Sequence, residues 1–164
     1  MDRINHIQAK ILDEPMLDAW LARMRFKKQK IVFTNGCFDI LHRGHIVYLS
    51  KAADAGDALI VGLNSDASVR KLKGLDRPII DQYSRALLLA SLSFVTAIVF
   101  FNEESPYELI RKVQPDVLIK GSDYRPEEIV GYDIVTAKGG EVLTIDIVEG
   151  FSSSSIISKI ANNI

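Results

Sequence analysis

The chain has 164 residues, of which 48% are hydrophobic and 25% charged, the balance of one globular domain with a sizeable core. Its formal net charge is −1, so no global positive field favours a nucleic-acid partner. Cys37 is the only cysteine, which excludes an intrachain disulfide framework and argues against a cysteine-based zinc site. Residues 1–10 are polar, and no apolar run approaches the roughly 18 residues that span a membrane. We therefore expect a cytoplasmic protein without a membrane partner.

The predicted elements alternate between strands and helices along the chain. Residues 1–29 are expected to be a helical extension, since Leu17, Trp20, Leu21 and Met24 recur at helical spacing, and residues 30–164 are expected to be the main domain. Short apolar runs predict five strands, at 30–34, 57–63, 97–100, 116–120 and 141–145. Helices are predicted at 45–55, 82–92, 106–113 and 152–160, with a short helix or loop at 65–72 and a helical turn at 125–130.

The predicted strands are continuous apolar runs, which is typical of strands buried on both faces of a parallel sheet. Alternation with helices predicts an α/β fold, a doubly wound five-stranded parallel sheet flanked by helices. Ligands of such sheets bind beyond the carboxyl ends of the strands. The segments that follow Thr34, Leu63, Ile119 and Ile145 are therefore the first places to search for a site.

Two histidines follow the first predicted strand, in the run TNGCFDILHRGH at residues 34–45. Gly36 stands where the backbone must turn, and His42 and His45 flank Gly44 where a helix begins. Residues three apart share a helix face, so both imidazoles are expected to point at one spot above the positive helix N-terminus, which suits a triphosphate. The alternatives are histidines that satisfy core hydrogen bonds, or a metal site with no evident third ligand.

Polar groups also follow the later strands. Lys71 and Lys73 come after the second strand and form either a phosphate clamp or a solvated surface pair. Lys120 ends a buried strand, where a charge needs a partner, and either pairs with Asp123 or faces a ligand. Residues 152–155 are four serines at the start of the last helix, where a hydroxyl caps the helix and free N–H groups bind an anion. An ordinary cap needs only one serine.

The His-x-Gly-His run, preceded by Gly-x-Phe-Asp, resembles the signature of a nucleotidyltransferase superfamily that includes glycerol-phosphate cytidylyltransferase and phosphopantetheine adenylyltransferase. From about Lys30 to Ile160 the chain is similar to the adenylyltransferase domain of the ADP-heptose synthase family. That resemblance implies a Rossmann-like nucleotidyltransferase domain that transfers AMP from ATP to D-glycero-β-D-manno-heptose 1-phosphate, in the supply of ADP-heptose for lipopolysaccharide. It also implies Mg²⁺ bound through the phosphates, with no protein metal site.

The resemblance assigns roles to matching positions. His42, His45, Lys71 and Lys73 are the expected catalytic residues, which contact the phosphates. The residues expected to bind the nucleotide are Asn35, Gly36, Cys37, Phe38, Gly44, Lys120, Gly121, Asp123, Tyr124, Ser152, Ser153 and Ser154. The residues expected to bind the acceptor are Asn64, Asp66, Arg77 and Arg85.

The family resemblance also implies partners. Its adenylyltransferase is often fused behind a sugar kinase, for which 164 residues leave no room, so a separate heptose kinase is expected. Members are often oligomeric, and an exposed apolar face of the N-terminal helix is a candidate contact for a homodimer.

One run departs from the superfamily pattern. Cytidylyltransferases typically carry Arg-Thr-Glu-Gly-Ile-Ser before the last helix, whereas residues 147–152 read Ile-Val-Glu-Gly-Phe-Ser, which favours ATP over CTP. The expected mechanism is in-line attack of the acceptor phosphate on the α-phosphorus, without a covalent enzyme intermediate. The alternatives are another small-molecule nucleotidyltransferase, similar to glycerol-phosphate cytidylyltransferase, or a non-catalytic nucleotide-binding module.

Overall fold

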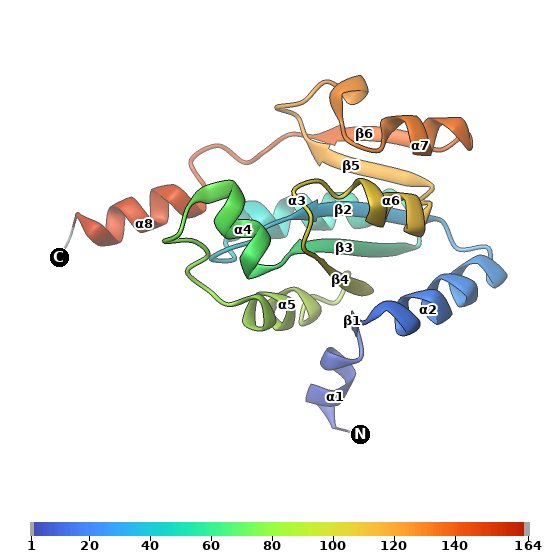
Figure 1. The fold of residues 1–164 in the computed structure, drawn as a ribbon, viewed down its shortest axis with the longest axis horizontal. Coiled ribbons are helices and arrows are strands. Elements are labelled where there is room, and N and C mark those ends of the chain that lie inside the picture. The colour runs from blue at the N-terminus through green and yellow to red at the C-terminus, as the bar shows by residue number, and fades with distance from the viewer. Residues whose placement is uncertain (1, 163–164) are drawn as a thin grey trace.

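A parallel sheet forms the centre of the protein in the computed structural model, which describes residues 2–162 (Figure 1). Within these residues the strand order is β1-β4-β3-β2-β5-β6. The strands are β1 (Ile11–Leu12), β2 (Ile31–Gly36), β3 (Ala58–Asn64), β4 (Ala97–Phe101), β5 (Val117–Gly121) and β6 (Glu141–Ile145). The helices are α1 (Arg3–Gln8), α2 (Glu14–Phe26), α3 (Arg43–Ala53), α4 (Asp66–Lys73), α5 (Gln82–Ala90), α6 (Tyr107–Val113), α7 (Tyr132–Ala137) and α8 (Ser153–Ala161), with a 3₁₀ turn η1 (Pro126–Glu128).

Helices cover both faces of the sheet. On one face Trp20 of α2, Ile110 of α6 and Val135 of α7 pack in one apolar cluster with Phe33 of the central strand β2. On the other face Leu49 of α3 and residues of α5 pack with Val32 of β2. Successive β2 residues therefore supply opposite cores, as the continuous apolar runs predict. The prediction of a doubly wound α/β sheet is confirmed.

The direction of chain progression reverses at β2. From β2 the chain moves outward through β3 and β4 on one side, and it returns to the other side to form β5 and β6. Val32 pairs with Val117 and Phe33 with Leu118 across the β2–β5 junction. A parallel sheet of this kind has a crevice at the carboxyl ends of the strands where the order reverses. The fold therefore places a crevice beside the segment that carries the histidines.

Side-chain caps set the helix starts around this crevice. Ser65 accepts a hydrogen bond from the backbone N–H of Ser68 at 3.2 Å, so the segment predicted as helix or loop forms α4. Asp81 accepts from the backbone N–H of Ser84 at 3.0 Å and begins α5. Each cap satisfies an N–H group that has no partner within the helix.

The sheet differs from the predicted one by a sixth strand, β1, which pairs Ile11 with Ile98 and Leu12 with Val99 of β4. Two residues are too few to show a period, so the sequence pattern could not reveal this strand or the short α1 before it. The expected exposed apolar face of the N-terminal helix is wrong, because Leu17 and Trp20 of α2 are buried against the sheet. The division at residue 29 stays a prediction. In the part of the chain that is described, no helix has the length and apolar character to cross a bilayer.

Candidate functional site

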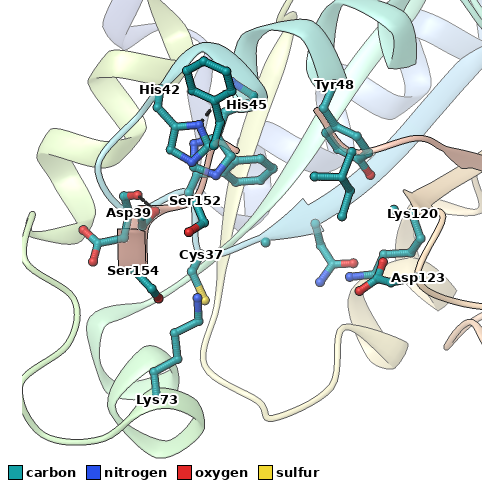
Figure 2. A pocket seen from close by; sticks show the side chains of 18 of the residues that line it. Cys37, Asp39, His42, His45, Tyr48, Lys73, Lys120, Asp123, Ser152 and Ser154 are labelled. Carbon is teal, nitrogen blue, oxygen red and sulfur yellow. Dashed lines mark hydrogen bonds between the residues drawn. The ribbon is translucent and has the colours of Figure 1, made fainter. Parts of the chain in front are cut away.

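A cavity of about 320 Å³ opens at the carboxyl ends of β2 and β5, in the crevice where the strand order reverses (Figure 2). Its walls come from the turn after β2, from α3, from the end of α4, from the segment after β5 and from the start of α8. The lining residues are Asn35, Gly36, Cys37, Phe38, Asp39, His42, Gly44, His45, Tyr48, Lys73, Lys120, Gly121, Asp123, Tyr124, Ile147, Phe151, Ser152, Ser153 and Ser154. All twelve residues expected to bind the nucleotide are among them.

The turn between β2 and α3 has an unusual backbone. Phe38 and Ile40 have φ values of 45° and 51°, in the left-handed region that residues with a side chain disfavour. Each such residue costs on the order of 1–3 kcal/mol, so the surrounding contacts must hold the turn in place. At Gly36 an added Cβ would lie 3.0 Å from the ring of Phe38, which explains the glycine at this position. The chain thus stores strain directly beside the cavity.

His42 caps the N-terminus of α3. Its Nδ1 accepts a hydrogen bond from the backbone N–H of Gly44 at 3.1 Å, so the neutral ring carries its proton on Nε2. The His45 ring stacks on it, with centroids 3.8 Å apart and planes inclined by 22°. Gly44 provides the room, because a Cβ there would lie 3.0 Å from the His42 ring and 3.3 Å from Cβ of Phe151. Figure 2 shows the two imidazoles together at the cavity wall.

Both imidazoles are neutral at pH 7. Burial, followed by repulsion from a protonated His42 and from Lys73, lowers the pKa of His45 to about 4, against the opposing effect of Asp39. Burial also lowers the pKa of His42. Neutral rings donate hydrogen bonds without bringing a fixed charge, a role that suits phosphate oxygens.

Two residues of the cavity wall carry buried polar atoms that favour a polar ligand. Nδ1 of His45 and Oδ1 of Asn35 are shielded from solvent, and among the described residues neither has a hydrogen-bond partner. Buried polar groups are almost always paired in native proteins, and exceptions concentrate where a ligand or water completes the pairing. The cavity is therefore built to receive a polar molecule.

Two lysines reach the cavity from different elements. Lys73 comes from the last turn of α4, and Lys120 from the end of β5. Burial lowers the pKa of Lys120, while the nearby carboxylate of Asp123 acts to raise it. Lys120 therefore lines the cavity, and the Asp123 carboxylate acts on it electrostatically from nearby (Figure 2).

The four serines at the start of α8 have separate tasks. Ser152 and Ser155 form a reciprocal capping box, in which each side chain accepts a hydrogen bond from the backbone N–H of the other. The Ser153 hydroxyl donates to the backbone carbonyl of Asp39, which ties α8 to the turn after β2. Ser154 lines the cavity. Only part of the run is a cap, and the N-terminus of α8 is directed at the cavity, where it favours an anion.

Five of the predicted site residues do not line the cavity: Lys71, Asn64, Asp66, Arg77 and Arg85. Lys71 is exposed on α4. Arg85 is fully buried and donates to Cys37 O at 2.6 Å, to Ile80 O at 2.9 Å and to Asp66 Oδ1 at 2.7 Å. Asn64 donates to Ser68 Oγ, and Arg77 to Asp39. The four residues expected to contact the acceptor substrate, Asn64, Asp66, Arg77 and Arg85, instead form hydrogen bonds within the protein.

The sequence pattern missed four lining residues, Asp39, Tyr48, Ile147 and Phe151. Tyr48 follows His45 by three positions, so helical spacing could have placed it on the same face. Its hydroxyl lies 2.7 Å from Thr34 Oγ1 and donates to Ile119 O at 3.2 Å, and burial raises its pKa to about 12. The hydroxyl thus joins β2 and β5 below the cavity. Ile147 and Phe151 belong to the run 147–152 that departs from the cytidylyltransferase pattern, but that comparison assigned neither of them a contact.

Acidic and thiol ligands do not converge in this region. Within residues 2–162 no group of three or more histidine, cysteine, aspartate and glutamate side chains is arranged to hold a metal ion. Both carboxylate oxygens of Asp39 accept hydrogen bonds from the segment that follows α4.

Comparison with known proteins gives consistent matches over most of the chain. Residues 33–159 match the model of a family described as cytidylyltransferase-like. The chain is 54% identical over 153 residues to the Bifunctional protein HldE of Wolinella succinogenes, covering 93% of this chain and 31% of that protein. It is 58% identical over 131 residues to the Bifunctional protein HldE of a Nitratiruptor species, covering 80% of this chain and 28% of that protein. The chain therefore spans less than a third of these relatives.

Two solved structures have a similar fold. A lipopolysaccharide core biosynthesis protein from Thermoplasma volcanium has 30% sequence identity and a TM-score of 0.60, with 73% of this chain and 97% of that chain covered. The pantoate-beta-alanine ligase of Francisella tularensis has 17% identity and a TM-score of 0.59, with 93% of this chain and 76% of that chain covered. The second likeness is one of fold alone.

Proposed function

The chain belongs to the cytidylyltransferase-like family, and from that premise we propose that it is an adenylyltransferase acting on D-glycero-β-D-manno-heptose 1-phosphate. It transfers AMP from ATP to this acceptor and releases pyrophosphate. The relatives named HldE and the similar lipopolysaccharide core biosynthesis protein support the acceptor. The observation that carries the proposal is the convergence of two neutral imidazoles, Lys73, Lys120 and the N-terminus of α8 on one cavity.

This convergence fits a nucleoside triphosphate. The phosphates need donors and positive charge, which Nε2 of His42, the ammonium of Lys73 and the first N–H groups of α8 supply from three sides. Neutral His45 offers a further hydrogen-bonding atom that has no partner among the described residues.

The reaction needs positioning and charge stabilisation more than covalent chemistry. An oxygen of the acceptor phosphate attacks the α-phosphorus in line, and the bond to the pyrophosphate oxygen breaks. The imidazole N–H groups donate to phosphate oxygens on which negative charge grows, and Lys73 stabilises the departing pyrophosphate. No side-chain nucleophile enters this scheme.

Mg²⁺ fits the proposal as an ion held mainly by the phosphates. The Asp39 carboxylate is already engaged by Arg77, Ile79 and Ile80, so Asp123 is the carboxylate of the cavity wall that is left to approach a metal or its waters. When bound, Mg²⁺ neutralises phosphate charge.

The choice of ATP is supported by the apolar part of the cavity. Ile147 stands where related cytidylyltransferases carry an arginine, and with Tyr124 and Phe151 it lines the cavity. These side chains offer stacking and apolar contact to a purine and no cation for a cytosine carbonyl.

The proposal also includes a kinase reaction that supplies the phosphorylated acceptor sugar. The acceptor carries a phosphate that a sugar kinase must add, and the matched relatives, named bifunctional, extend well beyond the region covered here. We place both reactions in the cytoplasm, where ATP is available, and the expected homodimer can be tested by the mass of the protein in solution.

The test is a pyrophosphate-release assay of the purified protein with ATP or CTP and a panel of acceptors. The panel contains heptose 1-phosphate, other sugar 1-phosphates, glycerol phosphate and pantetheine phosphate. We expect turnover with ATP and heptose 1-phosphate. Preferred turnover with CTP and glycerol phosphate would replace the proposal with the cytidylyltransferase alternative, and ATP binding without turnover on any acceptor would indicate a non-catalytic module.

A further inference from the structure

The side chain of Asp39 is almost completely buried, and it anchors a segment remote in the sequence. Its Oδ2 accepts hydrogen bonds from Nε of Arg77 and from the backbone N–H of Ile79, both at 2.9 Å, and its Oδ1 accepts from the backbone N–H of Ile80 at 3.0 Å. Burial raises the pKa of this carboxyl, but the three bonds together lower it below its ordinary value. The carboxylate is therefore ionised and fully engaged by residues 77–80, the segment that joins α4 to α5.

The backbone of the same residue contacts the other side of the cavity. The carbonyl oxygen of Asp39 accepts the hydrogen bond from the Ser153 hydroxyl at the start of α8. Asp39 also stands between Phe38 and Ile40, the two residues of the turn with positive φ. Its contacts thus lie at the most strained part of the turn, which the surrounding structure must hold in place.

Arg85 also binds the segment that joins α4 to α5. Its guanidinium donates to the carbonyls of Cys37 and Ile80 and to the carboxylate of Asp66. Ile80 is therefore held at its N–H by Asp39 and at its carbonyl by Arg85. The two charged side chains fix the β2–α3 turn, the segment after α4 and the first residue of α4 relative to one another.

We infer that Asp39 is a positioning residue of the transfer reaction, which keeps Lys73 and the N-terminus of α8 aligned with His42 and His45. Lys73 is the last residue of α4, four positions before Arg77, the first of the residues that bind the Asp39 carboxylate. Asp39 thus connects three groups that face the phosphates and come from distant parts of the chain. Arg85 and Asp66 belong to the same network. The inference rests on the proposed function only for its kinetic readout.

The first experiment compares Asp39→Asn with the wild-type protein in the pyrophosphate-release assay. The amide keeps the size of the side chain but turns a donor toward the N–H groups of Ile79 or Ile80, so the anchored segment shifts. Misplacing reacting groups by about 1 Å lowers turnover by up to about 100-fold, so we expect kcat to fall about 10- to 100-fold. We expect KM for ATP to change by less than about threefold, because the phosphate contacts themselves remain. Assays are run at an equal interval below each variant's melting temperature.

The matched control is Asp81→Asn. Asp81 is an exposed carboxylate at the end of the same segment, where it caps α5, and asparagine is an equally good cap. We expect wild-type kinetics in this variant. Wild-type kcat in Asp39→Asn, or an equal loss in both variants, would overturn the inference.

A double-mutant cycle with Ser153→Ala tests the connection to α8. If Asp39 and Ser153 act through one turn, the double variant loses much less than the product of the two single losses in kcat. Losses that multiply would show that Ser153 and Asp39 act independently and would overturn the coupling.

Hydrogen–deuterium exchange separates this inference from the proposed function, because it needs no substrate. Asp39→Asn is expected to speed amide exchange in residues 76–81 and also in residues 152–156, whereas Asp81→Asn leaves residues 152–156 as in the wild-type protein. Exchange that rises in 76–81 alone would contradict the coupling. A wild-type protein without turnover on any acceptor would refute the proposed function and leave this second readout valid.

Discussion

The two sides of the cavity are built differently. On one side, the β2–α3 turn lines the cavity and is backed by buried charged residues, Asp39 bonded to Arg77 and Arg85 bonded to Asp66. On the other side, where the start of α8 lines the cavity, the structure is more open: none of residues 153–161 of α8 is buried, and the neighbouring strand β6 is exposed at Glu141, Leu143 and Thr144. The start of α8 is held by its capping box, by the bond from Ser153 to Asp39 and by Arg43, which stacks on Phe151 with 4.9 Å between guanidinium carbon and ring centroid.

This difference shows how the molecule divides its tasks. The stacked imidazoles of His42 and His45 need a fixed position. They follow the strained β2–α3 turn, and the buried hydrogen bonds of Asp39 and Arg85 hold that turn in place. The groups that would receive the departing phosphates belong to a helix with little packing, whose position costs little to change. Substitutions behind the β2–α3 turn should therefore change mainly the free energy of unfolding of the whole protein. Substitutions in α8 should change mainly the local order of that helix.

The largest expected effect is on the buried side. Arg85→Ala removes a guanidinium with no exposed surface and leaves Asp66 and two carbonyls without their donor. Breaking a buried charged pair costs about 3–5 kcal/mol, so we expect the free energy of unfolding in urea to fall by about that amount. Arg70→Ala, at an exposed position of α4, is the control and should change it by less than about 0.5 kcal/mol. A similar change in the free energy of unfolding for both variants would contradict a stabilising buried network behind the β2–α3 turn.

A pH titration of stability tests the buried imidazole of His45 on the same side of the cavity. The pKa of His45 is lowered from 6.5 to about 4 in the folded protein, so protonation favours the unfolded chain. The contribution of neutral His45 is complete above pH 6.5 and is lost as the pH falls toward 4, a loss of about 3 kcal/mol in total. Urea unfolding of the wild-type protein should therefore show a larger decrease between pH 6.5 and 4 than unfolding of His45→Gln. Parallel pH profiles would contradict the neutral buried imidazole.

Catalysis should depend on the same residue. His45→Ala removes one phosphate donor, and the loss of a donor of this kind lowers kcat by about 100-fold or more, equivalent to about 2.7 kcal/mol. Lys51→Ala, exposed near the end of the same helix, should keep the wild-type kcat. Pyrophosphate release measures both, and unchanged turnover in folded His45→Ala would remove this histidine from the mechanism.

The smallest effect is expected on the open side. Ser152→Ala deletes the side chain that caps α8 and should lower the free energy of opening this helix by about 1 kcal/mol. Because α8 buries no residue, the urea midpoint of the whole protein should stay within error of the wild-type value. Amide exchange of residues 155–157 measures the local effect, and Ser158→Ala, exposed within the same helix, is the control. A large shift of the global midpoint would show that α8 is part of the cooperative core.

The sequence predicted the parts of this molecule that follow regular periods. Continuous apolar runs located the five longer strands, and the histidine motif located the cavity. The pattern could not decide between Lys71 and Lys73, since residues two apart point to nearly opposite sides of a helix and the phase of α4 comes from its packing. Of the two, Lys73 lines the cavity.

The charged residues behind the cavity were harder to interpret. Asp66 follows the end of β3, and Arg85 lies in a stretch that the family resemblance assigns to the acceptor. Both positions are equally consistent with contact to a substrate and with a buried bond across the fold. Which of these applies depends on burial, and burial of Arg85 results from the way the segment before α5 folds over it. Asp39 was visible in the motif, but its partners are 38–41 residues away in the chain and no local pattern connects them.

The exposed position of α8 has a consequence for the end of the catalytic cycle. Ser152 and Ser153 hold the first turn of α8 at the cavity, and the helix buries no residue, so release of this turn would open an exit for pyrophosphate without any rearrangement of the sheet. Under the proposed function, ordering this helix around the triphosphate would use part of the binding free energy. The lifetime of the product complex would then be set by how long the serine turn stays closed.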